Sequence, residues 1–192
     1  RESLDLAVVA RGVIAELQAR HPGVEVVLQV PTELPAQYLD GTRLRLLLRN
    51  LLENAVRHAG NGRDPDKKGA HGSAMSNEGG IATADMAASH GHTVAPDMDA
   101  IAMVRIDRIP TGGCVIEVRD WGPGVPEEQL SKLAEPFHRP DAARSRHAGG
   151  VGLGLYLCRL VAQAHGGRLA LENAHPGLRV RAWLPSDRQA PQ

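Results

Sequence analysis

The sequence predicts an α+β fold for this chain of 192 residues. Three stretches carry apolar residues at helical spacing, which indicates helices that bury one face. Two other stretches each contain a pair of strand-like segments joined by a short turn, which indicates two antiparallel hairpins. Together these elements place the chain in the α+β class.

The first sixty residues contain two helices and a strand. The first helix ends at the sequence HPG, and the following segment, VEVVLQVP, reads as a strand. The apolar face of the first helix consists of Leu6, Val9, Val13, Ile14 and Leu17. The second helix lies within DGTRLRLLLRNLLENAVRHAGNG, where Asp40 or Thr42 caps the start and Gly60 or Gly62 ends the helix.

The composition changes after the second helix. Residues 61–100 consist mainly of small and polar residues, and no leucine occurs between Leu52 and Leu130. Such a stretch buries too little apolar surface to offset its conformational entropy, so we expect a flexible insertion. One interpretation is a tolerated surface loop, and the other is a docking or regulatory segment.

The remaining elements follow in the second half of the chain. The segments IAMVRIDRIP and GCVIEVRDW form the first predicted hairpin, and GRLALEN and GLRVRAWLP form the second. Between them lie an irregular stretch from Gly122 to Gly150 and a helix from about Leu153 to His165. The tail, residues 186–192, is expected to be frayed.

Composition excludes several classes of protein. The formal net charge is zero and aromatic residues make up 3%, which argues against a nucleic-acid partner. The two cysteines, Cys114 and Cys158, are far apart and read as buried, reduced thiols of a cytoplasmic domain. No apolar run reaches the length of a membrane span, and the chain lacks an initial Met, so we expect a fragment of a longer protein.

The glycine run GGVGLGL, residues 149–155, is typical of loops that approach phosphate, since backbone N–H groups there can bind an anion. No lysine follows the run, which excludes a P-loop. No strand precedes it and the glycine spacing differs, which excludes a Rossmann loop. A glycine-rich helix start without a ligand is the alternative.

Two more features carry chemistry. On the second helix, Asn50, Asn54 and the pair Arg57 and His58 share one face, where carboxamide oxygens could bind Mg²⁺ and the basic groups could bind phosphate. The alternative is an asparagine pair that caps a neighbouring loop. In VRDWGPGVP, Asp120 ends a strand, and its carboxylate could accept a hydrogen bond from an amine or simply form an Asx turn.

In this order, the motifs resemble the ATP-binding catalytic domain of bacterial sensor histidine kinases, in the superfamily of DNA gyrase, heat-shock chaperone and MutL ATPases. The segments NLLENAVRHA, DWGPG, EPFHRPDAARS and GGVGLGL resemble its asparagine, first glycine, phenylalanine and second glycine boxes. The resemblance implies a single domain over residues 1–192, folded as a two-layer α/β sandwich with helices on one face of a mixed, mostly antiparallel sheet. It also implies a mobile ATP lid at residues 125–150.

The resemblance assigns roles to individual residues. Asn54 would ligate Mg²⁺ between the ATP phosphates, and Asp120 would bind the adenine amino group. Arg139 would reach the γ-phosphate, so Asn54 and Arg139 are the predicted catalytic residues. The other predicted nucleotide-binding residues are Asn50, Arg57, His58, Gly122, Gly124, Gly150, Val151, Gly152, Leu153 and Gly154.

The residue types favour phosphotransfer over hydrolysis. Hydrolytic relatives place a glutamate one turn before the magnesium ligand, where this chain has Asn50, and Glu53 lies about 100° around the helix. The implied acceptor is a histidine on a separate dimerisation domain, followed by a response regulator. We expect a monomeric fragment of a homodimeric, inner-membrane sensor. The alternatives are an ATPase or protein-serine kinase of the superfamily and a degenerate nucleotide-binding scaffold.

Overall fold

The computed structural model describes residues 1–59, 100–139 and 151–185. Predictions for most of the insertion, for Gly150 and the rest of residues 140–150, and for the tail lie outside the described residues. The described part contains a five-stranded sheet in the order β2-β4-β5-β7-β6. Its strands are β2 (Val26–Gln29), β4 (Ala102–Arg108), β5 (Cys114–Asp120), β6 (Arg168–Asn173) and β7 (Leu178–Leu184).

The sheet is mixed and mostly antiparallel, as predicted. Only the pairing of β2 with β4 is parallel, while β4–β5, β5–β7 and β6–β7 are antiparallel. Both predicted hairpins form. Strands β5 and β7 alternate strictly between buried and half-buried residues, because one face of the sheet meets the helices and the other faces solvent.

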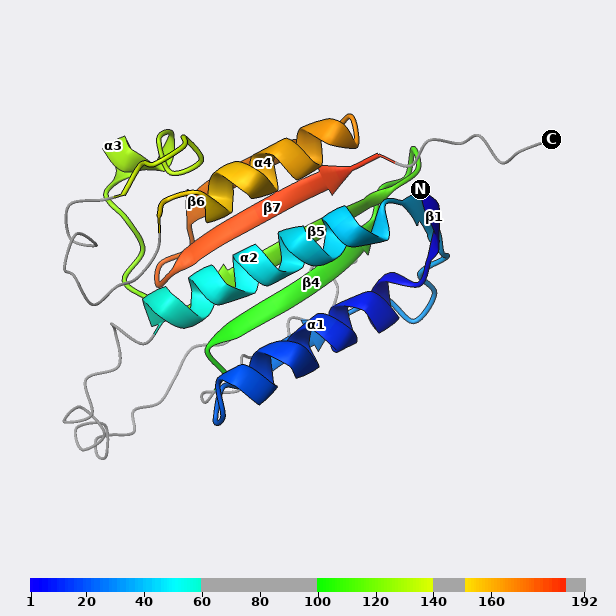
Figure 1. Ribbon diagram of the computed structural model, residues 1–192, viewed down its shortest axis with the longest axis horizontal. Helices are drawn as coiled ribbons and strands as arrows, with labels where there is room; N and C mark the ends of the chain where they lie inside the picture. Colours follow the sequence, from blue (N-terminus) through cyan, green and yellow to red (C-terminus); the bar gives the residue numbers. More distant parts are fainter. Residues whose placement is uncertain (60–99, 140–150, 186–192) are drawn as a thin grey trace, which may run out of the picture.

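Three helices cover one face of the sheet, which confirms the two-layer architecture (Figure 1). They are α1 (Leu6–Arg20), α2 (Gly41–Ala59) and α4 (Gly154–Ala164). Asp5 caps α1, since its carboxylate accepts hydrogen bonds from Ala7 and Val8 N–H. At the start of α2, Asp40 rather than Thr42 is the cap, with Arg43 N–H 2.9 Å from Asp40 Oδ1.

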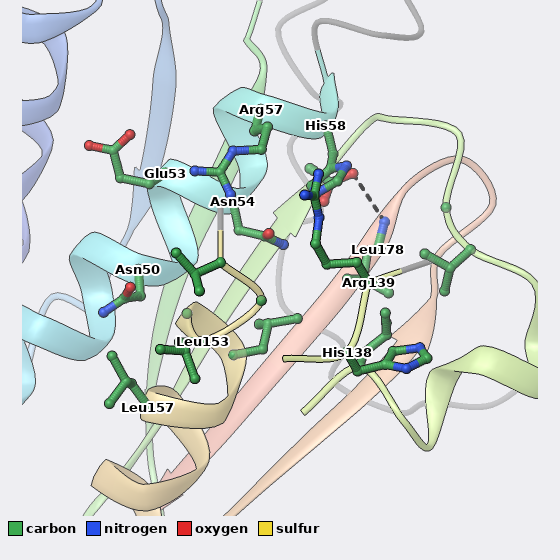
Figure 2. Close-up of a pocket in the computed structure, with 18 residues that line it drawn as sticks. Asn50, Glu53, Asn54, Arg57, His58, His138, Arg139, Leu153, Leu157 and Leu178 are labelled. Carbon is green, nitrogen blue, oxygen red and sulfur yellow. Dashed lines mark hydrogen bonds between the residues drawn. The ribbon is translucent and has the colours of Figure 1, made fainter. Parts of the chain in front are cut away.

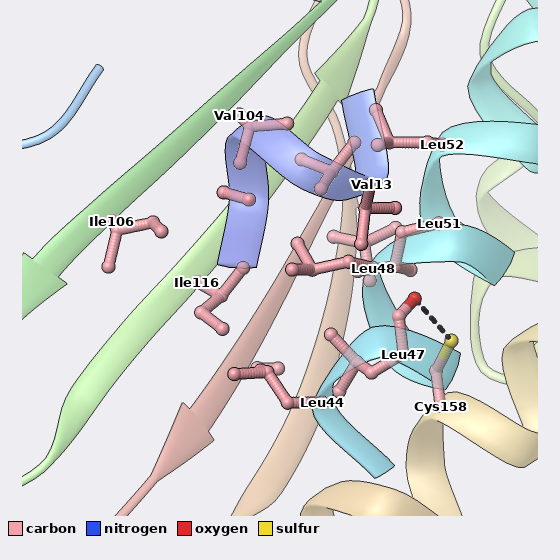
Figure 3. Close-up of a cluster of buried hydrophobic side chains, with 14 of the residues drawn as sticks. Val13, Leu44, Leu47, Leu48, Leu51, Leu52, Val104, Ile106, Ile116 and Cys158 are labelled. Atoms are coloured by element: carbon pink, nitrogen blue, oxygen red, sulfur yellow. Dashed lines mark hydrogen bonds between the residues drawn. The ribbon is translucent and has the colours of Figure 1, made fainter. Parts of the chain in front are cut away.

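The central helix α2 carries the core of the molecule. Its leucines pack between α1, α4 and the inner face of β4 and β5 (Figure 3). Five of the six leucines are at most 2% exposed: Leu44, Leu47, Leu48, Leu51 and Leu52. Cys158 of α4 reaches the carbonyl oxygen of Leu47 at 3.6 Å, and burial raises the pKa of this thiol to about 12. Both cysteines are buried, as predicted.

Three short elements were not predicted. Strands β1 (Glu2–Leu4) and β3 (Gln37–Leu39) form a separate two-stranded antiparallel sheet, and α3 (Glu127–Leu130) is a single helical turn after the first glycine box. Elements of three or four residues are too short to show a periodic pattern of apolar residues, so the sequence gives no signal for them.

Candidate nucleotide-binding site

A cavity of about 300 Å³ opens where the C-terminal half of α2 meets the start of α4, the end of β5 and the start of β7 (Figure 2). Residues of two segments on either side of residues 140–150, namely 124–139 and 151–155, also contribute to its wall. The lining residues are Asn50, Glu53, Asn54, Arg57, His58, Asp120, Gly124, Val125, Leu133, His138, Arg139, Val151, Gly152, Leu153, Gly154, Leu155, Leu157 and Leu178.

The polar face predicted for α2 lies against this cavity. Asn50, Asn54, Arg57 and His58 all line it, because positions three and four apart share one side of a helix. Among the described residues, Asn50 bonds to its own helix rather than to a loop, since its Nδ2 donates to the Leu46 carbonyl oxygen at 2.8 Å. The roles of these four residues toward a nucleotide stay predictions.

Glu53 also borders the cavity, but its carboxylate is occupied elsewhere. The side chain points away from Asn54 in Figure 2 and forms an ion pair with Arg20 at the end of α1. Its Oε2 lies 3.2 Å from Nε2 of His21. The Glu53 carboxylate, three residues after the predicted general-base position at Asn50, therefore binds the end of α1 and is not directed at the cavity.

Asp120 occupies the inner end of the cavity and is only 5% exposed. Its Oδ1 accepts hydrogen bonds from Gly122 N–H at 2.9 Å and from Leu178 N–H at 3.1 Å, the latter dashed in Figure 2. Burial raises the pKa of this carboxyl above its usual range, although the two hydrogen bonds oppose the shift. The predicted Asx-type turn is therefore present, and the same carboxylate also lines the cavity.

His58 lies beside Asp120 at the end of α2. Burial lowers the pKa of the imidazole, with smaller contributions from the nearby Arg57 and Arg139, and the Asp120 carboxylate opposes them. Because its pKa lies below the usual value of about 6.5, His58 is neutral at pH 7. A neutral ring can lie against a ligand without adding charge, and the positive charge of this cavity comes from arginines.

The two glycines of DWGPG differ in position. Gly124 lines the cavity, whereas Gly122 is buried and lies outside the residues that line it. A Cβ atom placed on Gly122 would lie 2.9 Å from the His58 carbonyl oxygen. Gly122 therefore allows the chain after β5 to approach the end of α2, which differs from the predicted approach to a base.

The second glycine box forms the opposite wall. Val151, Gly152, Leu153 and Gly154 line the cavity, and α4 starts at Gly154. Phe137, inside the predicted lid, contacts this box, because its N–H donates to the Gly152 carbonyl oxygen at 3.1 Å.

Several cavity residues were missed by the sequence analysis. Val125, Leu133, Leu155, Leu157 and Leu178 form an apolar wall, but an apolar residue that lines a cavity is not distinguishable by sequence from a core residue. His138 was given no role and occurs only within EPFHRPDAARS, the segment that resembles the phenylalanine box. Its Nε2 is buried and has no hydrogen-bond partner among the described residues.

Residues 39–188 match the family model described as histidine kinase-, DNA gyrase B- and HSP90-like ATPase. The chain belongs to this ATPase family. The match covers all four predicted boxes, from the asparagine-bearing face of α2 to the glycine run at α4. Among the described residues of this family member, no helix has the length and apolar character needed to cross a membrane.

The curated relatives of this ATPase domain are larger sensor kinases. The adaptive-response sensory kinase SasA of Synechococcus sp. (strain CC9902) is 32% identical over 171 residues, which are 88% of this chain and 34% of that protein. The alginate biosynthesis sensor protein KinB of Pseudomonas aeruginosa is 31% identical over 161 residues, covering 84% of this chain and 20% of KinB. The chain thus spans about a third or less of these relatives.

Solved structures share the fold. The mycobacterial sensor histidine kinase MprB superposes with a TM-score of 0.63 at 22% identity, covering 96% of this chain and 97% of that one. The full-length ShkA, solved in complex with AMPPNP, gives a TM-score of 0.62 at 22% identity over 96% of this chain and 31% of ShkA. These matches confirm the α+β fold of the histidine-kinase ATPase type.

Proposed function

We propose that this chain is the catalytic ATP-binding domain of a sensor histidine kinase and that it supplies the γ-phosphoryl group to a histidine on a separate domain. The observation that carries the proposal is that Asn54, Asp120 and Arg139 line one cavity of about 300 Å³ bordered by the glycine run. These residues supply a metal ligand, a base-recognising carboxylate and a cation, which are the parts that phosphoryl transfer from a nucleotide needs.

Asp120 is suited to selecting adenine. Its Oδ1 is already bound by two backbone N–H groups, which fix the orientation of the carboxylate at the inner end of the cavity. A fixed acceptor there favours the exocyclic amino group of adenine over the carbonyl of guanine. The apolar wall around Leu133 and Leu178 provides the surface that a purine ring would cover.

The residues present also fit a magnesium ion bound together with the nucleotide. Mg²⁺ keeps several water ligands and is usually held by one or two protein oxygens plus substrate phosphates. The Asn54 carboxamide lines the cavity and provides one such oxygen, and Figure 2 shows it directed into the centre of the site. When bound, the ion would neutralise charge on the phosphates.

The same site disfavours hydrolysis. Asn50 cannot act as a general base, and the nearest carboxylate on α2, Glu53, is bound by Arg20 and His21. Arg57 and Arg139 line the cavity and can balance phosphate charge while the acceptor approaches. We propose that the acceptor histidine belongs to the dimerisation domain of a cytoplasmic kinase region and that a response regulator receives the phosphoryl group from it.

The proposal is tested by phosphoryl transfer with γ-labelled ATP. The chain alone should bind Mg-ATP and acquire no stable label on histidine. A version joined to a histidine-bearing dimerisation domain of a related sensor kinase should become labelled, and Asn54→Ala should abolish that labelling. Stable label on a histidine of the isolated chain, or rapid release of free phosphate, would contradict the proposed role.

A further inference from the structure

Asn173, the last residue of β6, forms three side-chain hydrogen bonds at the start of the predicted lid. Its Oδ1 accepts from Val125 N–H at 3.0 Å, and its Nδ2 donates to the Val125 carbonyl oxygen at 2.7 Å. Nδ2 also donates to Oε1 of Glu127 at 2.8 Å. We propose that Asn173 is a positioning residue, which fixes the wall of the nucleotide site at Val125 without touching the ligand.

The two hydrogen bonds from Asn173 to the backbone of Val125 take the place of the backbone hydrogen bonds that a neighbouring strand would supply. Val125 lies outside the sheet and before α3, so no neighbouring strand pairs with its backbone. A carboxamide provides one acceptor and two donors, and can therefore satisfy both polar groups of one residue. Val125 lines the cavity, whereas Asn173 is outside the lining residues. Asn173 thus acts on the site through Val125.

Gly124 leaves room for this arrangement. A Cβ atom on Gly124 would lie 2.7 Å from the Asn173 Oδ1, too close for an undisturbed carboxamide. The backbone of Gly124 also has a φ of 73°, a conformation that favours glycine. The first glycine box therefore serves the contact with Asn173 in addition to bordering the cavity.

The turn that follows Asn173 reaches the other end of the site. Ala174 N–H donates to the Gly177 carbonyl oxygen at 2.8 Å and closes the β6–β7 turn. The next residue, Leu178, donates its N–H to the Asp120 carboxylate. One turn therefore holds both the carboxylate expected to recognise the base and, through Asn173, the start of the lid. This arrangement fixes the spacing between the two.

The inference rests on the proposed function, and two separate measurements keep them distinguishable. The first is amide hydrogen exchange at Val125 in the 192-residue chain without nucleotide. The second is binding of a fluorescent, non-hydrolysable ATP analogue with magnesium. If the wild-type chain fails to bind the analogue, the proposed function fails, while the exchange measurement still tests the contact between Asn173 and Val125.

We expect Asn173→Ala to accelerate exchange at Val125 and to weaken analogue binding about 10-fold, because two hydrogen bonds that fix this wall are lost. Asn173→Asp should also weaken analogue binding, since a carboxylate cannot donate to the Val125 carbonyl oxygen and repels Glu127, but it should accelerate exchange at Val125 less than Asn173→Ala because it still accepts from the Val125 N–H. Because Asn173→Asp keeps the side-chain volume, it also tests the contact if the alanine variant does not fold. In the N173D background, Glu127→Gln should recover part of the binding, because it removes the repulsion.

Glu172→Gln is the matched control, since this neighbour on β6 pairs with Arg179 and Arg181 on the outer face of the sheet. It should leave exchange at Val125 and analogue binding unchanged. The inference is overturned if N173A binds the analogue as tightly as the wild type, or if binding weakens while exchange at Val125 stays the same.

Discussion

At the scale of single residues, the site contains a buried carboxylate that lowers the stability of the fold when it is ionised. Asp120 is buried, and burial raises its pKa, so the carboxyl group favours folding fully only below its unfolded pKa of about 3.8. That contribution is lost as the pH rises through the raised pKa of the folded state. At neutral pH the ionised group therefore lowers the free energy of unfolding. Such a cost is typical of residues retained for binding.

Asp120→Asn should separate binding from stability. The amide keeps an oxygen for the N–H groups of Gly122 and Leu178 but presents an NH₂ group in place of the acceptor for the adenine amine. We expect binding of an ATP analogue to weaken about 10-fold or more. We also expect the urea midpoint of the nucleotide-free chain to rise at pH 8, because no buried charge remains.

The pH dependence provides the check on this prediction. The stability difference between D120N and the wild type should narrow as the pH falls, because the wild-type carboxyl becomes protonated. Glu117→Gln, on the outer face of the same strand, should not affect analogue binding. A D120N variant that is less stable than the wild type at pH 8 and binds normally would show that Asp120 is only a turn residue.

At the scale of elements, α2 serves both the core and the site. One side of the helix buries leucines, and the other presents Asn50, Asn54 and His58 to the cavity. The start of this helix is fixed by His165, which is 2% exposed and follows α4. The Nε2 of His165 accepts from Asp40 N–H at 3.2 Å, and Nδ1 lies 2.8 Å from the Val161 carbonyl oxygen, to which it donates. His165 therefore links α2 to α4.

His165→Leu should destabilise the chain by about 2 kcal/mol, because it removes both hydrogen bonds and leaves the Asp40 N–H without its partner. Urea unfolding followed by circular dichroism measures the change. The control is Gln163→Leu on the exposed side of α4, which should change stability by less than about 0.5 kcal/mol. Equal stability of the two variants would contradict a linking role for His165.

Helices and strands whose apolar residues recur at a regular spacing could be predicted from the sequence. Contacts between segments that are distant in the sequence could not. The leucine spacing of α2 and the alternation of β5 predict which face is buried, and the face carrying Asn50 and Asn54 follows from the same period. The contact of Asn173 with Val125 joins positions 48 residues apart, for which the local pattern contains no signal. His165 reads only as the end of a helix, although its partner Asp40 lies 125 residues away.

At the scale of the whole molecule, the three-helix layer leaves the site at one end of the sandwich, where the end of α2 and the start of α4 meet the end of β5 and the start of β7 (Figure 1). Three of the four boxes lie at the end of α2, the end of β5 and the start of α4, so the fold brings them together at this end of the sandwich. The core stays in the interior of the two layers, while the residues proposed to bind nucleotide are gathered at one end. Nucleotide binding should therefore proceed without disturbing the core.

The central claim, that the cavity binds magnesium-ATP through Asp120, is tested most directly by calorimetric titration of the 192-residue chain with a non-hydrolysable ATP analogue and its GTP counterpart, both with magnesium. We predict saturable binding of the ATP analogue and at least about 10-fold weaker binding of the GTP analogue, since guanine presents a carbonyl to the carboxylate. Absence of ATP-analogue binding, or equal affinity for the two analogues, would contradict the claim.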